Sequence, residues 1–302
     1  MTTAARPTSL PGVLLITLLL FAAPVTADAD DSPKGIGLAL GSGGAGGLAH
    51  IAMLEVLEEL SIKPDAISGS SIGAIVGALY AAGLDSEGIR ELFEEFGESA
   101  MNPFSGWTND GNGMGWTDLV GLDLANDGLI STDGFLELVG QHIEARDFSD
   151  LEIPLKIVAT DYWSGEPVVL DEGDLFKAIK ASMAVPGLFA PVKDGDRLLI
   201  DGGVSNPLPW DLLEEQDLVI AIDVTGTRKP SSDGSPGITT LLFKTFEIMQ
   251  GALIQQKLAA APPDIYIKPE LDDVRLLHFD RVDEVISQAG SAADELRGRL
   301  SE

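Results

Sequence analysis

Short apolar runs alternate along the chain with longer segments in which apolar positions recur at helical spacing. The apolar runs predict strands at 36–40, 66–68, 155–160, 198–200, 218–222 and 265–267. The intervening periodicity predicts helices at 48–60, 72–82, 86–96, 134–145, 175–183, 240–258 and 282–300. Strands that alternate with helices favour a parallel sheet covered on both faces. We therefore expect an α/β fold, a three-layer α/β/α sandwich with a mainly parallel central sheet.

The first part of the chain has a different pattern. Arg6 is the only charged residue before Asp28, and residues 13–23 form an apolar run that ends near small residues. This pattern is typical of a secretory signal peptide, residues 1–27, with cleavage after Ala27 or Ala29. The alternative is an uncleaved N-terminal membrane anchor. We expect an exported protein, secreted or periplasmic, with a disordered acidic lead-in at 28–34 and a single domain at 35–302.

Composition and charge narrow the classes of partner and chemistry. Hydrophobic residues make up 45% of the 302 residues, enough for a sizeable core, and the formal net charge is −29. A strongly negative protein repels nucleic acid and anionic membranes at low salt, so we expect no nucleic-acid partner. The acidity favours either adaptation to a saline medium or simple solubility of an exported protein. The chain has no cysteine, which excludes disulfides, a thiol nucleophile and thiolate metal sites.

A G-x-S-x-G turn presents a candidate nucleophile. Gly69-Ser70-Ser71-Ile72-Gly73 follows a predicted strand and opens a predicted helix. The two flanking glycines, Gly69 and Gly73, allow a sharp strand-to-helix turn that exposes Ser71 at the top of the sheet. The helix dipole favours developing negative charge at that position. We predict acyl transfer by Ser71; the alternative is a structural serine in a turn.

An earlier glycine-rich turn, residues 41–47, supplies candidate donors for an oxyanion. Attack on an ester carbonyl needs preorganised N–H groups, and the backbone amides of Gly43, Gly44 and Ala45 are the best candidates. The alternative is a nucleotide or phosphate loop. No Lys-Ser/Thr pair follows the turn, and no acidic residue ends the second strand, so we reject a nucleotide site.

The base that activates the serine must come from elsewhere in the chain. Asp201, followed by Gly202, comes directly after the predicted strand 198–200, where α/β sheets place their sites. One alternative is a turn aspartate, since Asp-Gly is a common turn pair. Another is a triad of Ser71, Asp201 and His278, in the chain order of α/β-hydrolases. The triad is disfavoured because too few strands precede Ser71.

A segment rich in Gly, Asn and Asp interrupts the pattern at residues 99–128. It carries four large apolar side chains, Phe104, Trp107, Met114 and Trp116. One interpretation is a flap that covers the site or touches a lipid interface, since Trp favours that boundary. The other is an insertion that its aromatic residues hold against the domain.

Four motifs in order resemble the bacterial branch of the patatin-like phospholipase family. They are residues 41–50, 69–73, 181–189 and 201–203, and the resemblance covers about residues 35–280. It implies that Ser71 is the nucleophile and Asp201 its base, with the glycine loop as oxyanion hole. It also implies hydrolysis of acyl esters of phospholipids and related lipids without an obligatory metal or other cofactor, and a fold related to cytosolic phospholipase A2. Separately from the resemblance, we expect transient contact with a membrane interface.

One position departs from the family pattern. The family usually carries a cation, most often Arg, where this chain has Gly46. A cation there would support the loop or attract lipid phosphate. Its absence keeps a second hypothesis open, a non-catalytic exported lipid- or partner-binding protein on the same fold.

Overall fold

The computed structural model describes residues 1–2, 35–101, 132–226 and 238–301. All the described helices and strands belong to one compact unit, Pro33–Glu302. Apart from residues 1–2, the predicted leader at 1–27 and lead-in at 28–34 lie outside the described residues. So does most of the insertion at 99–128, including its four large apolar side chains. These assignments stay predictions.

The centre of the described fold is one mixed sheet. Its strands are β1 (Ile36–Leu40), β2 (Ala66–Ser70), β3 (Leu155–Asp161), β4 (Pro167–Leu170), β5 (Val192–Asp194), β6 (Arg197–Asp201), β7 (Leu218–Ile222) and β8 (Ile265–Ile267). The order is β5-β6-β3-β2-β1-β7-β8, and β4 also pairs with β3. The run β3-β2-β1-β7-β8 is parallel, and the pairings of β4, β5 and β6 are antiparallel. The predicted mainly parallel sheet is confirmed.

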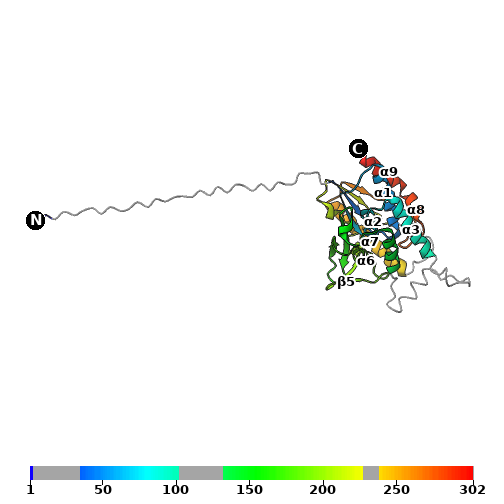
Figure 1. The fold of residues 1–302 in the computed structure, drawn as a ribbon, viewed down its shortest axis with the longest axis horizontal. Helices are drawn as coiled ribbons and strands as arrows, with labels where there is room; N and C mark the ends of the chain where they lie inside the picture. Colours follow the sequence, from blue (N-terminus) through cyan, green and yellow to red (C-terminus); the bar gives the residue numbers. More distant parts are fainter. Residues whose placement is uncertain (3–34, 102–131, 227–237, 302) are drawn as a thin grey trace, which may run out of the picture. The chain divides into compact units, whose positions relative to one another are not determined.

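Helices flank this sheet (Figure 1). They are α1 (Ala49–Glu59), α2 (Ile72–Ala81), α3 (Ser86–Met101), α5 (Asp133–His142), α6 (Leu175–Ser182), α7 (Ile238–Ala260), α8 (Val282–Gln288) and α9 (Gly290–Leu300). Short 3-10 helices lie at η1 (Gly44–Leu48), η2 (Phe148–Asp150), η3 (Gly202–Val204) and η4 (Trp210–Leu213). None of the helices in the described part of the chain is both long and apolar enough to cross a membrane.

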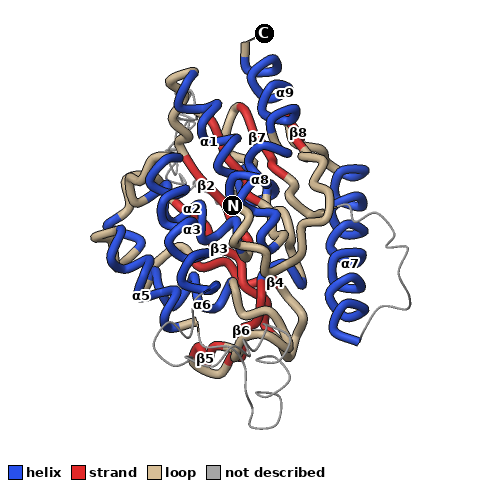
Figure 2. Tube along the Cα trace, turned by 90° about the vertical axis from the view of Figure 1, so that its right-hand side faces the viewer, coloured by secondary structure: helices blue, strands red, loops and turns tan. Residues whose placement is uncertain are grey.

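Alternate residues of β1 enter separate hydrophobic cores, one on each face of the sheet. Leu38 and Leu40 join the larger core under α1, α2, α3, α5, α6, α8 and α9. Ala39 joins a smaller core with Trp210 of η4 and Ile254 of α7. This alternation follows from the period of two along a strand. Figure 2 accordingly shows α7 on the other side of the sheet from α3 and α5, and the predicted α/β/α layering is confirmed.

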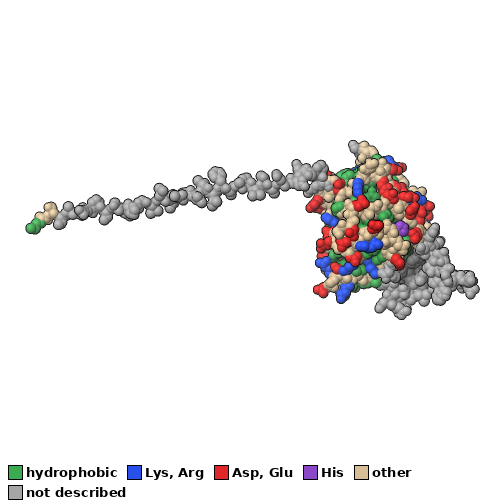
Figure 3. All heavy atoms as spheres, viewed as in Figure 1, with side chains coloured by type: hydrophobic (Ala, Val, Ile, Leu, Met, Phe, Trp, Pro, Cys, Tyr) green, Lys and Arg blue, Asp and Glu red, His purple; other side chains and the backbone are tan. Residues whose placement is uncertain are grey.

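Two features differ from the predicted elements. Strands β4 and β5 were not predicted. Strand β4 is apolar but only four residues long and partly exposed, and β5 has three residues, two of them charged. The helix predicted at 282–300 is two helices, α8 and α9, separated at Ala289. Gly290 follows the break, and glycine has a low helix propensity. Acidic side chains are spread over the face in Figure 3, as expected from the net charge of −29.

Candidate active site

Ser71 occupies a sharp turn between β2 and α2. Its backbone has φ 55° and ψ −121°, a strained conformation for a residue with a side chain. The flanking glycines are sterically required. A Cβ on Gly73 would lie 2.1 Å from the carbonyl oxygen of Leu40, and one on Gly69 would lie 2.5 Å from that of Gly73. The turn predicted from G-x-S-x-G is therefore present, with Ser71 as the N-cap of α2.

Asp201 reaches the serine because of how β6 joins the sheet. Strand β2 pairs with β3 up to Val158, and β6 pairs with β3 from Ala159 onward. Because β4 occupies the other side of β3 at both positions, β6 takes the place in the sheet that β2 leaves. Strand β6 is antiparallel to β3, so its last residue, Asp201, lies next to the end of β2. The strand end was predicted from the sequence, whereas the antiparallel direction of β6 was not.

The two side chains share a short hydrogen bond. Ser71 Oγ donates to Asp201 Oδ2 at 2.6 Å, and the amide of Gly203 donates to Asp201 Oδ1 at 2.7 Å. Asp201 is fully buried. Burial raises the pKa of Asp201 to about 7, against the opposing effect of the two hydrogen bonds. A carboxyl group with a pKa near neutrality can accept and return a proton at physiological pH.

Ser182, the last residue of α6, holds the backbone of the serine turn. The amide of Ser71 donates to Ser182 Oγ at 2.9 Å, and Ser182 Oγ donates to the carbonyl of Val158 at 2.6 Å. The residue is fully buried. Ser182 belongs to the motif at residues 181–189, but no role was predicted for it from the sequence. Its helix packs on β3 beside the site, a tertiary contact that local sequence does not reveal.

The glycine loop lies between β1 and α1, beside the serine turn. Its Ala45 amide donates to the carbonyl of Leu276 at 2.9 Å, so this predicted oxyanion donor is occupied. In the described part of the chain, the amides of Gly43 and Gly44 have no hydrogen-bond acceptor. The set of three predicted donors is thereby reduced to two free amides, which lie at the start of η1.

His50 supports this loop from α1. Its Nε2–H donates to the carbonyl of Gly41 at 3.0 Å, and the ring is fully buried. Burial lowers the pKa of His50 to about 4, so the ring is neutral at physiological pH. The contact ties the second residue of α1 to the first residue of the glycine loop.

The structure gives a steric reason for glycine at position 46. A Cβ on Gly46 would lie 2.8 Å from the carbonyl oxygen of Val224 and 3.3 Å from Leu271. Val224 follows the end of β7, and its backbone occupies the space that a side chain at position 46 would need. Local packing therefore leaves no room for a cationic side chain at position 46, since even alanine would force the neighbouring backbone to shift.

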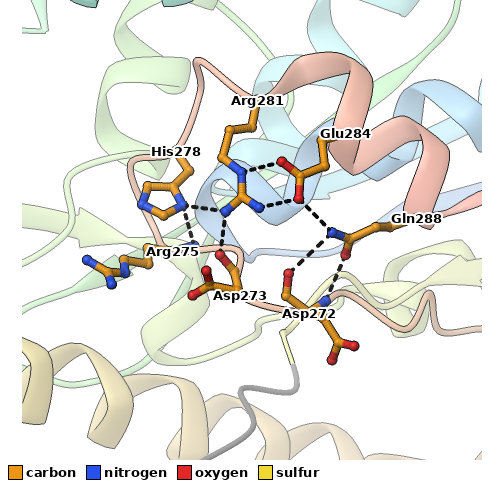
Figure 4. Close-up of polar contacts among 7 residues, drawn as sticks. All are labelled: Asp272, Asp273, Arg275, His278, Arg281, Glu284 and Gln288. Carbon is orange, nitrogen blue, oxygen red and sulfur yellow. Dashed lines mark hydrogen bonds and ion pairs between the residues drawn. The ribbon is translucent and has the colours of Figure 1, made fainter. Parts of the chain in front are cut away.

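His278 lies in a separate polar network before α8 (Figure 4). Its Nδ1 accepts from the amide of Arg275 at 3.3 Å and from Arg281 Nη1 at 3.1 Å. Partial burial and the two nearby arginines lower the pKa of His278. None of the hydrogen bonds described for this residue reaches Ser71 or Asp201, as the alternative triad would require.

Within residues 35–101, 132–226 and 238–301, no group of three or more His, Asp or Glu side chains is arranged to hold a metal ion.

Comparisons with known proteins show which chains this one is similar to. The model of the family described as patatin-like phospholipase matches residues 38–214. An uncharacterized NTE family protein of Mycobacterium tuberculosis is 34% identical over 211 residues, covering 69% of this chain and 54% of the relative. The patatin-like phospholipase domain-containing protein 7 of Rattus norvegicus is 31% identical over 278 residues, covering 83% of this chain and 20% of the relative.

A solved structure shares the fold. VipD from Legionella pneumophila aligns with a TM-score of 0.51 at 14% identity, covering 88% of this chain and 67% of that one. At such low identity the likeness concerns the fold alone. The chain spans about half the length of the mycobacterial relative that it matches. Together with the match of the family model, these findings show that the chain belongs to the patatin-like phospholipase family.

Proposed function

We propose that this protein is a serine hydrolase that cleaves carboxylic esters of lipids through Ser71 and Asp201. The observation that carries the proposal is the 2.6 Å hydrogen bond from Ser71 Oγ to a fully buried carboxyl group. A hydroxyl is a weak nucleophile until an adjacent base accepts its proton. Membership of the patatin-like phospholipase family supports lipid esters as the substrate class.

The reaction proceeds in two stages. In the first, Ser71 Oγ attacks the ester carbonyl carbon while Asp201 accepts the hydroxyl proton. The amides of Gly43 and Gly44 donate to the negative oxygen that forms. When the C–O bond breaks, Asp201 returns the proton to the leaving alcohol, and an acyl group stays on Ser71. In the second stage, Asp201 accepts a proton from water while the water oxygen attacks the acyl carbonyl carbon. When the bond between that carbon and Ser71 Oγ breaks, Asp201 returns the proton to Ser71 Oγ and the carboxylic acid leaves.

The buried environment of Asp201 suits these proton transfers. With a pKa of about 7, the carboxyl group is largely ionised at pH 8 and still basic enough to accept a proton from Ser71. A carboxyl group at its ordinary pKa would be a much weaker base. The strained backbone at Ser71, held by Ser182, directs the oxygen toward Asp201 before substrate binds.

The proposal is tested by substitution and ester hydrolysis. With a chromogenic fatty-acyl ester, Ser71→Ala and Asp201→Asn should each lower kcat by about 10⁴-fold or more while circular dichroism stays unchanged. His278→Ala is the matched control and should keep activity within about twofold. Retained turnover by Ser71→Ala would refute the proposal. Loss of activity in His278→Ala alone would favour the triad.

A further inference from the structure

The exposed large hydrophobic side chains are not scattered over the molecule. Among the described residues, Met1 apart, they lie in only two segments, the β3–β4 hairpin and α7. Four of them are on α7, and we call them the α7 stripe: Leu241, Leu242, Ile248 and Met249. Leu242 is 65% exposed and Met249 55%. Contiguous apolar surface of this kind marks an interaction site more often than isolated exposed residues do.

The α7 stripe forms one uncharged face of the helix. From Leu241 to Ala252, the exposed positions recur at helical spacing and include, besides the stripe, only Thr245 and Ala252. The opposite face holds the buried Gln250 and Ile254, which pack toward the sheet. Helix α7 is thus apolar on its outer face as well as toward the sheet, and no described residue covers the outer face.

The stripe lies close to the candidate active site. Gln250 is 3% exposed, and its Nε2 donates to the carbonyl of Gly203 at 3.3 Å. The amide of Gly203 in turn donates to Asp201. Since α7 leads from parallel strand β7 to β8, it runs opposite to these strands, and its N-terminal half points toward the edge where β2 ends. The stripe belongs to that half.

A second group of exposed apolar side chains lies at the same edge of the sheet. Tyr162 and Trp163 follow the carboxyl end of β3, and their rings contact edge to face with centroids 4.8 Å apart. Trp163 is 74% exposed. Trp and Tyr favour the boundary between lipid and water, because each ring has an apolar body and a polar group.

The net charge of the protein determines which kind of lipid surface the α7 stripe can bind. The protein carries a net charge of −29, so an anionic membrane repels it, whereas the α7 stripe has no charged residue. We infer that the α7 stripe inserts into an electrically neutral, zwitterionic lipid surface and brings the edge of the sheet with Ser71 to the substrate. This inference rests on the proposed function and adds the surface through which the enzyme meets its substrate.

Binding is tested apart from catalysis. The protein from Asp28 onward is used, because an apolar leader would itself bind lipid and all described elements lie in the unit Pro33–Glu302. It carries Ser71→Ala and is sedimented with phosphatidylcholine vesicles. Adding Leu242→Glu and Met249→Glu should weaken binding by about tenfold or more. The matched control, Gln255→Glu with Gln256→Glu, adds the same charge to exposed positions of the same helix and should change binding less than twofold.

Activity separates this inference from the proposed function. In active enzyme, the stripe substitutions should slow hydrolysis of vesicle phospholipid about tenfold and leave a water-soluble short-chain ester unaffected. Stripe-dependent binding by a protein inactive on both substrates would support the surface and refute the proposed function. Equal binding by the stripe and control variants, or no binding to phosphatidylcholine vesicles, would overturn the inference. So would light scattering that shows the stripe substitutions converting a dimer into a monomer.

Discussion

The pKa of Asp201 makes the pH dependence of activity a quantitative test. If Asp201 must be ionised to accept the proton of Ser71, kcat/KM should follow the ionised fraction of this carboxyl group. With a pKa of about 7, that fraction is about 1% at pH 5 and about 90% at pH 8. At the ordinary pKa of 3.8 it would already be about 94% at pH 5. The predicted ratio of kcat/KM between pH 8 and pH 5 is therefore about 90, against about 1 for an unperturbed aspartate.

The assay is hydrolysis of a soluble acyl ester between pH 5 and pH 9. Circular dichroism at each pH shows whether the protein stays folded, and recovery of activity at pH 8 shows that acid has not irreversibly inactivated it. A plateau that extends down to pH 5 would refute the reasoning, because a carboxyl group that ionises below pH 4 cannot produce a loss near neutrality.

Stability provides an independent measure of the same ionisation. The folded-state pKa of Asp201 lies above the unfolded value, so the charged form is disfavoured in the fold. Its contribution to stability is present below pH 3.8 and is lost as pH rises through 7, by about 4 kcal/mol. Asn cannot ionise, so Asp201→Asn should not lose this stability. The free energy of unfolding of Asp201→Asn minus that of wild type should therefore increase from pH 5 to pH 8.5. An equal difference at both pH values would contradict the burial argument.

Three further predictions concern residues around the site. His50 has a folded pKa of about 4 against 6.5 unfolded, so stability should fall by about 3 kcal/mol between pH 6.5 and pH 4, and His50→Gln should remove this loss in urea titrations. Ser182→Ala leaves the Ser71 amide without its acceptor, and steady-state kinetics should show kcat about 10- to 100-fold lower with KM nearly unchanged. Gly46→Ala should lower the free energy of unfolding by about 1–3 kcal/mol, because its Cβ meets a backbone carbonyl. The control Gly251→Ala on α7 meets nothing within 4 Å and should be neutral or stabilising.

The serine turn was predictable because its requirements are local. Gly69 and Gly73 indicate positions where neighbouring backbone leaves no room for a side chain. The apolar runs before and after them predict the strand and the helix on either side of Ser71. The long central strands were equally clear, since buried β1 and β7 are continuous apolar runs. Features that depend on residues close together in the sequence, such as this turn and the buried strands, could therefore be predicted.

The remaining features depend on tertiary contacts. The direction of β6, which brings Asp201 beside Ser71, is set by pairing with β3 and not by its own residues. The Ala45 amide is unavailable as an oxyanion donor because it donates to the carbonyl of Leu276, which is distant in the sequence. The role of Ser182 likewise follows from the packing of α6 on β3. Such contacts leave no periodic signal in a single sequence.

The central claim is that Ser71 Oγ is a nucleophile activated by Asp201. The most direct test is mass spectrometry of the protein after reaction with a fluorophosphonate, which modifies only an activated serine. We predict one adduct, located on Ser71, absent from Ser71→Ala and formed at least about 100-fold more slowly in Asp201→Asn. An unmodified Ser71, or equal reactivity in Asp201→Asn, would contradict the account.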